Sequence, residues 1–267
     1  MEKIPPELIT SFKNPKVQTV RELLSSRKSR QDQQACVVEG IRLAEEAVAS
    51  GVKLHYAFFS EGISHRGLEL VDVIQNQNVP CYKVPDDLMS RISATEADQG
   101  LLLVLEPQKD ALPKTVDFVL ILDEIKDPGN MGTILRTARA AGVQLVIITP
   151  GCVDVYSPKV LRAGMGAHFS LPICTLTWDE IMQYWTSQPG SPELFLAESA
   201  QGECIWQMDL TKPLGLIIGG EADGASETAR QYATRVMNIP MPGGSESLNA
   251  AVAAGIFMFE VARQRSE

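Results

Sequence analysis

Short apolar runs alternate with periodic amphipathic stretches along the first hundred residues. The apolar runs, which have the length and character of strands, are residues 36–38, 54–59, 79–84 and 100–105. The amphipathic stretches, which repeat every three or four residues as helices do, are residues 15–26, 41–49, 67–75 and 86–92. Leu68, Val71 and Ile74 are expected to lie on one side of the third of these helices. Alternating strands and helices predict a small α/β layer structure.

The same alternation begins again near residue 116. Strands are predicted at residues 119–122, 145–149, 194–197, 214–218 and 236–239. Helices are predicted at residues 131–141, 158–165 and 226–233, from Thr177 or Asp179 through Trp185, and from Leu248 onwards. Residues 107–115 are polar, contain two prolines and show no periodicity, which is typical of a linker. We therefore expect an N-terminal domain over 1–106, a linker over 107–115 and a C-terminal domain over 116–267.

The last predicted helix follows a loop rich in glycine and serine. Ser245 and Ser247 are residue types that begin helices, and either could cap this one. The loop glycines allow close approach of a ligand, and a helix N-terminus offers free N–H groups. The helix itself is rich in alanine and glycine, which indicates tight packing against a neighbour. A plain strand–loop–helix connection is the alternative interpretation.

Composition and charge narrow the class of protein. The chain is 45% hydrophobic with a net charge of −9, which argues against indiscriminate nucleic-acid binding. No apolar run approaches the roughly 20 residues of a membrane span, and the N-terminus lacks the apolar core of a signal peptide, so we expect a cytoplasmic protein. The five cysteines and three histidines show no metal-ligand spacing, so reduced thiols and no metal are expected.

A basic segment interrupts this acidic chain between Lys13 and Arg30. Six basic residues lie in it, opposed only by Glu22. Arg27, Lys28 and Arg30 are therefore candidate RNA contacts, because local patches decide where a nucleic acid binds. The alternative is a solvated helical face.

The helix that follows Asn130 has two faces at helical periodicity. One carries Gly132, Arg136 and Arg139, and the opposite, core-facing side carries Ile134, Ala138 and Ala141. Arg136 thus points away from the core near a helix start, where it could handle a phosphate or a reacting hydroxyl. A solvent-facing arginine is the alternative.

Two further basic residues, Lys159 and Arg162, are three positions apart and so share a helical face. With Arg136 and Arg139 they could form a second basic surface, because arginine is suited to forked contacts with phosphate. Ordinary surface charge is again the alternative.

The sequence lacks the glycine-containing motifs of dinucleotide-binding enzymes, phosphate-loop proteins and serine hydrolases. Residues 219–224 follow a predicted strand directly, where α/β sheets bind ligands, but match neither G-x-G-x-x-G nor the phosphate loop. Residues 243–247 do not form the G-x-S-x-G elbow of serine hydrolases. The sequence therefore disfavours a dinucleotide-dependent oxidoreductase.

Three stretches together resemble the motifs of the SpoU-type branch of the SPOUT RNA 2′-O-ribose methyltransferases. They are Asp127-Pro-Gly-Asn-Met-Gly-Thr-Ile-Leu-Arg-Thr-Ala138, Leu216-Ile-Ile-Gly-Gly-Glu-Ala-Asp-Gly224 and Ile239-Pro-Met-Pro-Gly-Gly-Ser-Glu-Ser-Leu-Asn249. Residues 157–167 add a fourth similar segment, and the likeness spans about residues 116–263. Residues 37–46 are similar to the ribosomal-protein-like RNA-binding domain of many family members.

The resemblance implies a fold, a cofactor and partners. The C-terminal domain would be a parallel α/β sheet whose last segment threads into a deep trefoil knot, an exception to the usual rule. S-adenosylmethionine would be held bent in the knot, and the active site would form across a homodimer. Ribosomal RNA is the expected substrate, tRNA is the alternative within the class, and a catalytically silent RNA-binding protein is an alternative outside it.

Individual site residues follow from the same resemblance. The positions that match the family's backbone contacts to the cofactor are Gly219, Ile239 and Leu248. The positions that match its catalytic site are Asn130, Arg136, Glu221, Ser247 and Asn249. Arg136 is the candidate that activates the ribose hydroxyl, although a guanidinium is a poor base and could instead orient the hydroxyl and a phosphate. The chain departs from the family pattern at Asp98, Gly164, Ala222 and Ala250.

Overall fold

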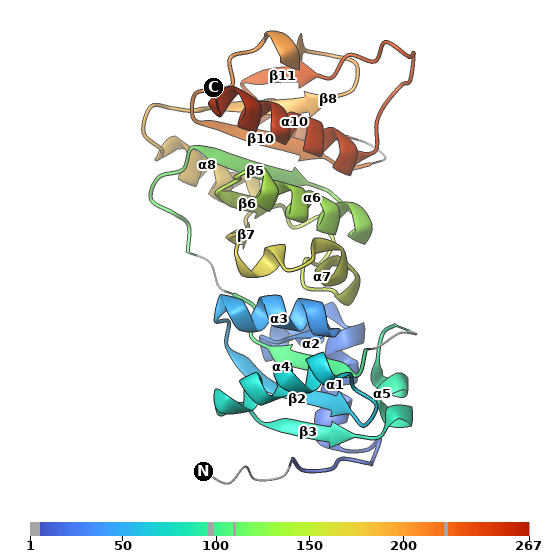
Figure 1. The fold of residues 1–267 in the computed structure, drawn as a ribbon. Helices are drawn as coiled ribbons and strands as arrows, with labels where there is room; N and C mark the ends of the chain where they lie inside the picture. The colour runs from blue at the N-terminus through green and yellow to red at the C-terminus, as the bar shows by residue number, and fades with distance from the viewer. Residues whose placement is uncertain (1–5, 96–98, 109–110, 222–223, 267) are drawn as a thin grey trace. The chain divides into compact units, whose positions relative to one another are not determined.

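The computed structural model describes residues 6–95, 99–108, 111–221 and 224–266. Of the departures from the family pattern, Asp98 and Ala222 lie outside these residues. The chain divides into two compact units (Figure 1). Unit 1 contains Met1–Gln108 and Tyr156–Phe169, and unit 2 contains Lys109–Val155 and Ser170–Glu267.

Unit 1 is built on a four-stranded mixed sheet. Its strands are β1 (Cys36–Glu39), β2 (Leu54–Ser60), β3 (Cys81–Val84) and β4 (Leu101–Leu105), in the order β1-β4-β2-β3. Its first helices are α1 (Pro15–Ser25), α2 (Arg27–Gln33), α3 (Ile41–Ser50), α4 (His65–Asn76) and α5 (Asp86–Ile92). β2 and β3 are parallel, whereas β4 runs antiparallel to both of its neighbours.

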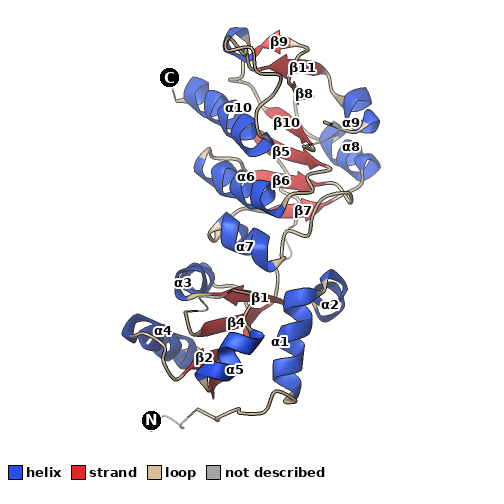
Figure 2. Cartoon of the chain, turned by 90° about the vertical axis from the view of Figure 1, so that its right-hand side faces the viewer, coloured by secondary structure: helices blue, strands red, loops and turns tan. Residues whose placement is uncertain are grey.

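Successive strand residues of this sheet point to two separate cores. Val37, Phe58 and Leu102 pack with apolar residues of α1 and α5, whereas alternate strand positions pack under α3 and α4 (Figure 2). The predicted α/β layer structure is therefore confirmed. Val71 and Ile74 are buried together with Leu70, whereas Leu68 is 46% exposed. The helix begins earlier than predicted, because Ser64 caps it.

A segment from the C-terminal half of the chain completes unit 1. Helix α7 (Pro158–Gly164) and a 3₁₀ turn (Ala167–Phe169) belong to it by their contacts, and α7 lies against β1. Arg162 forms an ion pair with the buried Glu39, with 3.2 Å between Nη1 and Oε2, and Leu161 enters the core under α3 and α4. The two units are thus joined by three chain connections.

Unit 2 is a parallel sheet of seven strands. They are β5 (Phe118–Asp123), β6 (Leu145–Ile148), β7 (Ile173–Thr175), β8 (Glu193–Glu198), β9 (Glu203–Cys204), β10 (Leu214–Gly219) and β11 (Arg235–Asn238). Their order is β7-β6-β5-β10-β8-β11-β9, and each neighbouring pair is parallel. The central strands are buried throughout, as expected of a sheet covered on both faces.

Helices cover both faces of this sheet. α8 (Trp178–Thr186) and α9 (Glu227–Tyr232) share one core with the strands, while α6 (Pro128–Ala140) and α10 (Ala250–Arg265) lie side by side on the opposite face (Figures 1 and 2). A short 3₁₀ turn, Ile205–Gln207, contacts α10. None of the helices in the described part of the chain has the length and apolar character needed to cross a lipid bilayer.

The starts of α6 and α10 differ from the prediction. Helix α6 begins at Pro128, since Asp127 Oδ1 accepts a hydrogen bond of 2.8 Å from the Asn130 amide. Neither Ser245 nor Ser247 caps α10. Asn249 does, because its Oδ1 accepts hydrogen bonds from the backbone amides of Ala251 and Val252, at 3.0 and 3.3 Å.

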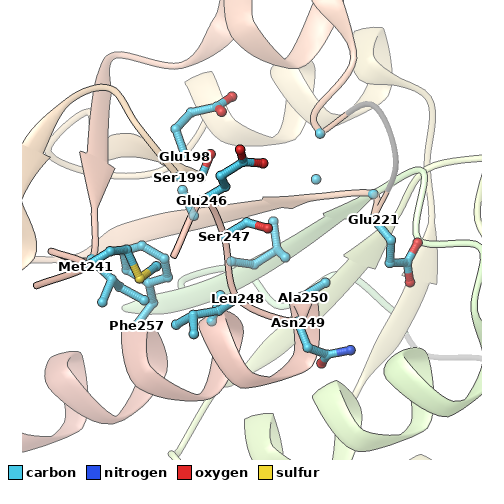
Figure 3. Close-up of a pocket in the computed structure, with 17 residues that line it drawn as sticks. Glu198, Ser199, Glu221, Met241, Glu246, Ser247, Leu248, Asn249, Ala250 and Phe257 are labelled. Atoms are coloured by element: carbon cyan, nitrogen blue, oxygen red, sulfur yellow. The ribbon is translucent and has the colours of Figure 1, made fainter. Parts of the chain in front are cut away.

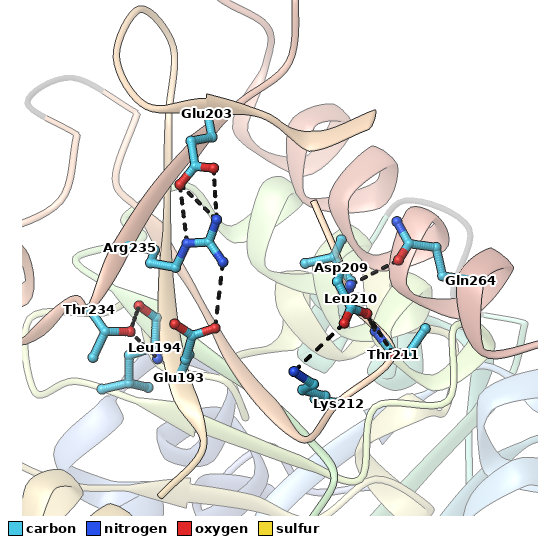
Figure 4. Close-up of polar contacts among 10 residues, drawn as sticks. All are labelled: Glu193, Leu194, Glu203, Asp209, Leu210, Thr211, Lys212, Thr234, Arg235 and Gln264. Atoms are coloured by element: carbon cyan, nitrogen blue, oxygen red, sulfur yellow. Dashed lines mark hydrogen bonds and ion pairs between the residues drawn. The ribbon is translucent and has the colours of Figure 1, made fainter. Parts of the chain in front are cut away.

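Side-chain contacts fix the edge of the sheet that contains β8, β11 and β9, and they also fix the C-terminal end of α10 (Figure 4). Arg235 of β11 bridges two strands, with Nη2 2.7 Å from Glu203 Oε2 and Nη1 3.6 Å from Glu193 Oε2. Gln264 of α10 accepts a 2.8 Å hydrogen bond from the Leu210 amide and donates to the Met208 carbonyl at 3.0 Å. The last helix is thereby fixed at its C-terminal end as well as at its cap.

Candidate cofactor pocket and active site

A pocket of about 560 Å³ opens at the carboxyl ends of β8, β10 and β11 (Figure 3). Its walls are the ends of β8 and β10, the segment between β11 and α10, and the first turns of α10. Carboxyl ends of parallel strands are the usual ligand-binding edge of an open α/β sheet. The location alone therefore marks a candidate small-molecule site.

Six of the residues selected from the sequence line this pocket. They are Gly219, Glu221, Ile239, Ser247, Leu248 and Asn249. They come from segments that are far apart in the chain and meet only at this edge of the sheet. The roles assigned to them remain predictions, but the structure places them around a single cavity.

Gly219, the last residue of β10, packs against the chain that returns to the sheet. A Cβ built on it would lie 2.2 Å from the Ala225 nitrogen and 2.5 Å from the Ala225 Cα. Real side chains do not approach backbone so closely, so any larger residue would force the loop apart. The neighbouring Gly220 amide donates a 2.9 Å hydrogen bond to the Gly224 carbonyl.

A chain of polar contacts joins the pocket to the first turn of α6. Asn130 Nδ2 donates to Glu221 Oε1 at 2.8 Å, and Asn249 Nδ2 donates to Asn130 Oδ1 at 2.9 Å. The backbone amides of Lys126 and Asp127 also donate to the Glu221 carboxylate, both at 3.3 Å. Asn130 does not line the pocket itself, but it connects two residues that do. The network fixes the relative positions of the β10 loop and the two helix starts.

Substitution of Asn249 can separate its two roles. Asn249→Ser keeps an oxygen that caps α10 but loses the donor to Asn130, so the free energy of unfolding should change by less than about 0.5 kcal/mol. Asn249→Ala loses both contacts and should cost about 1 kcal/mol. Urea unfolding of the two variants measures the difference. Equal destabilisation by both substitutions would contradict the capping role.

Carboxylates dominate the charge of the pocket. Glu198, Glu221 and Glu246 line it, and no lysine, arginine or histidine is among its described lining residues. Glu198 also forms an ion pair with Arg230 of α9. The remaining walls are mostly small or apolar, including Ile239 and Phe257. This environment favours a ligand with a positive centre and an apolar ring.

Arg136 lies on the exposed side of α6 and is not among the residues that line the pocket. In the described part of the chain its guanidinium makes neither a hydrogen bond nor an ion pair. The predicted orientation of Arg136 and Arg139 toward solvent is confirmed, and Ile134 and Ala138 face the core. Gly132, expected on the exposed face, is buried.

The basic residues selected as RNA contacts fall into different environments. Arg27, Lys28, Arg139 and Lys159 are exposed, while Arg162 is half-buried in its ion pair with Glu39. Arg30 differs from the expectation: its side chain is buried, with 7% of the residue exposed, and it donates to the Leu23 carbonyl. It holds α2 against α1 instead of facing solvent. The joint basic surface of the α6 and α7 residues stays a prediction.

Two structural residues of the site were missed in the sequence. Asp127 forms a cap and first-turn pair with Pro128, a signal that was present and could have located the start of α6. Asp123, at the end of β5, accepts 2.7 Å and 3.1 Å hydrogen bonds from the Ser226 amide and the Trp178 indole. It fixes the start of α9, and only the fold brings these partners together.

Two family models match the chain. The SpoU rRNA Methylase family matches residues 117–259, and an MRM3-like substrate binding domain matches residues 14–103. These two matches correspond to the motif-bearing region and to the N-terminal α/β layer structure.

The similarity to individual relatives extends over nearly the whole chain. An uncharacterised tRNA/rRNA methyltransferase of Synechocystis is 32% identical over 96% of this chain and 94% of its own. A 23S rRNA uridine 2′-O-methyltransferase of Streptomyces viridochromogenes is 31% identical over 99% and 95%. The crystal structure of the SpoU methyltransferase AviRb from that organism, in complex with AdoMet, has a TM-score of 0.84 at 30% identity, covering 95% of this chain and 99% of that one. The chain is therefore a methyltransferase of the SpoU rRNA methylase family.

Proposed function

We propose that this protein transfers the methyl group of S-adenosylmethionine to the 2′-hydroxyl of a ribose in ribosomal RNA. The observation that carries the proposal is the convergence of Gly219, Ile239 and Leu248, with Glu221 and Asn249, around one pocket. Relatives named as 23S rRNA 2′-O-methyltransferases, from Streptomyces viridochromogenes and Bacillus subtilis, favour ribosomal over transfer RNA.

The pocket fits S-adenosylmethionine in size and chemistry. Its volume of about 560 Å³ is within the range of small-molecule sites. The carboxylate of Glu246 provides negative charge for a ligand with a sulfonium and an amino group, whereas Glu198 is already paired with Arg230. Ile239, Leu248 and Phe257 provide apolar surface for an adenine ring. Gly219 and Gly220 line the pocket, and the missing side chains let other backbone segments pack closely behind them.

The chemistry needs positioning more than it needs a strong base. When bound, the cofactor supplies a methyl group made electrophilic by its sulfonium. The ribose oxygen forms the new C–O bond as the C–S bond breaks, the electron pair stays on sulfur, and the hydroxyl proton passes to water. Arg136 orients the hydroxyl and the adjacent phosphate. The Glu221–Asn130–Asn249 chain holds the loops around the cofactor in place.

A homodimer would complete this site. Arg136 does not line the pocket of its own chain. α10, packed beside α6, presents an apolar stripe to solvent, with Val252 and Phe259 both 51% exposed and Ile256 half-buried between them. We propose that a second copy covers this stripe and that each copy provides Arg136 to its partner's pocket.

Light scattering tests the dimer directly. The protein should have twice the 29.1 kDa mass of one chain, and Phe259→Lys should produce monomers, because a charge on a buried apolar face costs several kcal/mol. Lys212→Glu, a change of charge at an exposed site, is the control and should remain dimeric. A monomeric wild-type protein would contradict the proposed assembly.

Transfer of labelled methyl from S-adenosylmethionine to purified rRNA and tRNA tests the reaction. Incorporation into rRNA, with alkali-stable dinucleotides that mark a 2′-O-methyl group, is the expected result. Incorporation into tRNA alone would show that the substrate is tRNA. Cofactor binding without turnover on either RNA or on ribosomal precursors would favour a silent RNA-binding protein. The trefoil knot and the cytoplasmic location also remain predictions.

A further inference from the structure

Two arginines on the outer surface of unit 1 are stacked on one aromatic ring. The guanidinium carbons of Arg21 (α1) and Arg91 (α5) each lie 4.4 Å from the ring centroid of Phe12. Both side chains are exposed, and within the described residues neither has a carboxylate partner. Arg21 Nη1 donates to Gln18 Oε1 at 3.3 Å. The ring attracts both cations and so holds two like charges close together.

Lys16, five residues before Arg21 on α1, also lies over aromatic rings. Its Nζ lies 5.3 Å from the ring centroid of Tyr56 and 5.1 Å from that of Tyr82. The two tyrosine rings are themselves 6.1 Å apart and form an edge-on pair on β2 and β3. Lys16 likewise has no carboxylate partner among the described residues. Aromatic side chains therefore position three cations of unit 1, which are Lys16, Arg21 and Arg91.

A hollow of about 390 Å³ lies between α1 and α5 beside these cations; we call it the α1/α5 hollow. Its polar lining consists of Gln18, Arg21, Glu22, Ser25, Arg91 and Ser93. Hydrogen-bond donors thus outnumber the one carboxylate. A site rich in donors and cations, on a chain with net charge −9, is suited to a polyanion.

We propose that the α1/α5 hollow binds the phosphate backbone of single-stranded RNA, with Arg21 and Arg91 contacting phosphates and Lys16 extending the track along α1. The inference rests on the proposed function, because an RNA-modifying enzyme needs a surface that holds its substrate. Guanidinium forks match phosphate geometry. Stacking on Phe12 orders both forks before the RNA arrives, which lowers the entropic cost of binding. Arg27 and Lys28, exposed on α2 directly after α1, would continue the same surface.

The test is binding of fluorescein-labelled oligouridylate to the full chain, followed by anisotropy over a series of KCl concentrations. In the double variant Arg21→Ala/Arg91→Ala, Kd should rise by at least about tenfold, because each arginine makes a charge-assisted contact. The slope of log Kd against log KCl should fall by about 1.4, since each phosphate contact on a single strand contributes about 0.7.

A second variant separates charge from positioning. Phe12→Leu keeps both guanidiniums but removes their ring, so Kd should rise by about threefold while the salt slope stays unchanged. The matched control is Lys53→Ala/Arg66→Ala, which removes two exposed charges of unit 1 that are paired with Glu106 and Glu45. Its Kd and slope should equal those of the wild type.

The inference is overturned if the Arg21/Arg91 variant, folded by circular dichroism, keeps the wild-type Kd and slope. It is also overturned if the wild type binds polyglutamate but not oligouridylate, which would indicate an acidic protein partner. Methyl transfer to rRNA is measured in parallel. Transfer that survives in the variant with unchanged KM would overturn this inference alone, whereas a wild type that binds RNA but transfers no methyl group would contradict the proposed function alone.

Discussion

Replacement of Arg136 by alanine should reduce methyl transfer by about a hundredfold to a thousandfold, the loss typical of removing a charged group that stabilises a transition state. The dissociation constant for S-adenosylmethionine should stay within about twofold of the wild type, because Arg136 is not among the residues that line the pocket. Single-turnover methyl transfer and isothermal titration calorimetry measure the two quantities. Folding should be unaffected, since Arg136 is exposed and makes no hydrogen bond or ion pair within the described residues.

Mixing two inactive variants decides whether Arg136 acts in its own pocket or in its partner's. Arg136→Ala and Glu221→Gln chains, refolded together, form some dimers in which one pocket has both an intact Glu221 and an intact partner arginine. Random pairing should then restore about a quarter of the wild-type rate, as the symmetry of a two-fold dimer requires. No restoration would mean that the arginine acts within one chain. Arg139→Ala is the control, because it removes a neighbouring exposed arginine and should retain most activity.

Gly219→Ala should abolish cofactor binding and destabilise unit 2 by about 3 kcal/mol, the upper end of the usual cost of overpacking. The added Cβ would lie 2.2 Å from the Ala225 nitrogen, and backbone cannot rotate away as a flexible side chain can. The loop that carries Glu221 would have to move, and the contact between Glu221 and Asn130 would be lost with it. Thermal unfolding and cofactor titration measure both effects.

Gly243→Ala is the matched control, because it makes the same chemical change in a second loop of the same region. A Cβ built on Gly243 meets no heavy atom within 4 Å. Stability and cofactor binding should therefore be close to those of the wild type. If Gly219→Ala behaved like Gly243→Ala, the close approach of Gly219 to Ala225 would not be a requirement of the pocket.

The local pattern of residue types was sufficient to predict most helices and strands and to identify the family. Apolar runs such as 100–105 and 214–218 predict strands because their burial on both faces leaves the same signature wherever they lie. The motif residues could be selected because each belongs to a short motif that is local in sequence, and Gly219, Ile239 and Leu248 of two different motifs line one pocket. The start of α10 was missed, because a serine and an asparagine are equally good caps by type.

Contacts between distant segments could not be predicted in the same way. Arg30 belongs to a basic run in the sequence, yet its side chain turns inward to the Leu23 carbonyl. Helix α7 lies in the C-terminal half of the chain, yet Arg162 pairs with Glu39 of unit 1. In both cases a partner outside the local segment decides the outcome, and periodicity carries no information about that partner.

The sequence by itself determined most of the elements, the two α/β layers and the membership of the SpoU family, since each depends on residue type and spacing along the chain. Only the tertiary structure decided how these residues work together. It joined Glu221, Asn130 and Asn249 into one network, left Arg136 outside the lining of the pocket and placed Arg21 and Arg91 over the ring of Phe12. These arrangements depend on packing between segments that are far apart in the chain, where small differences in burial and hydrogen bonding select one geometry.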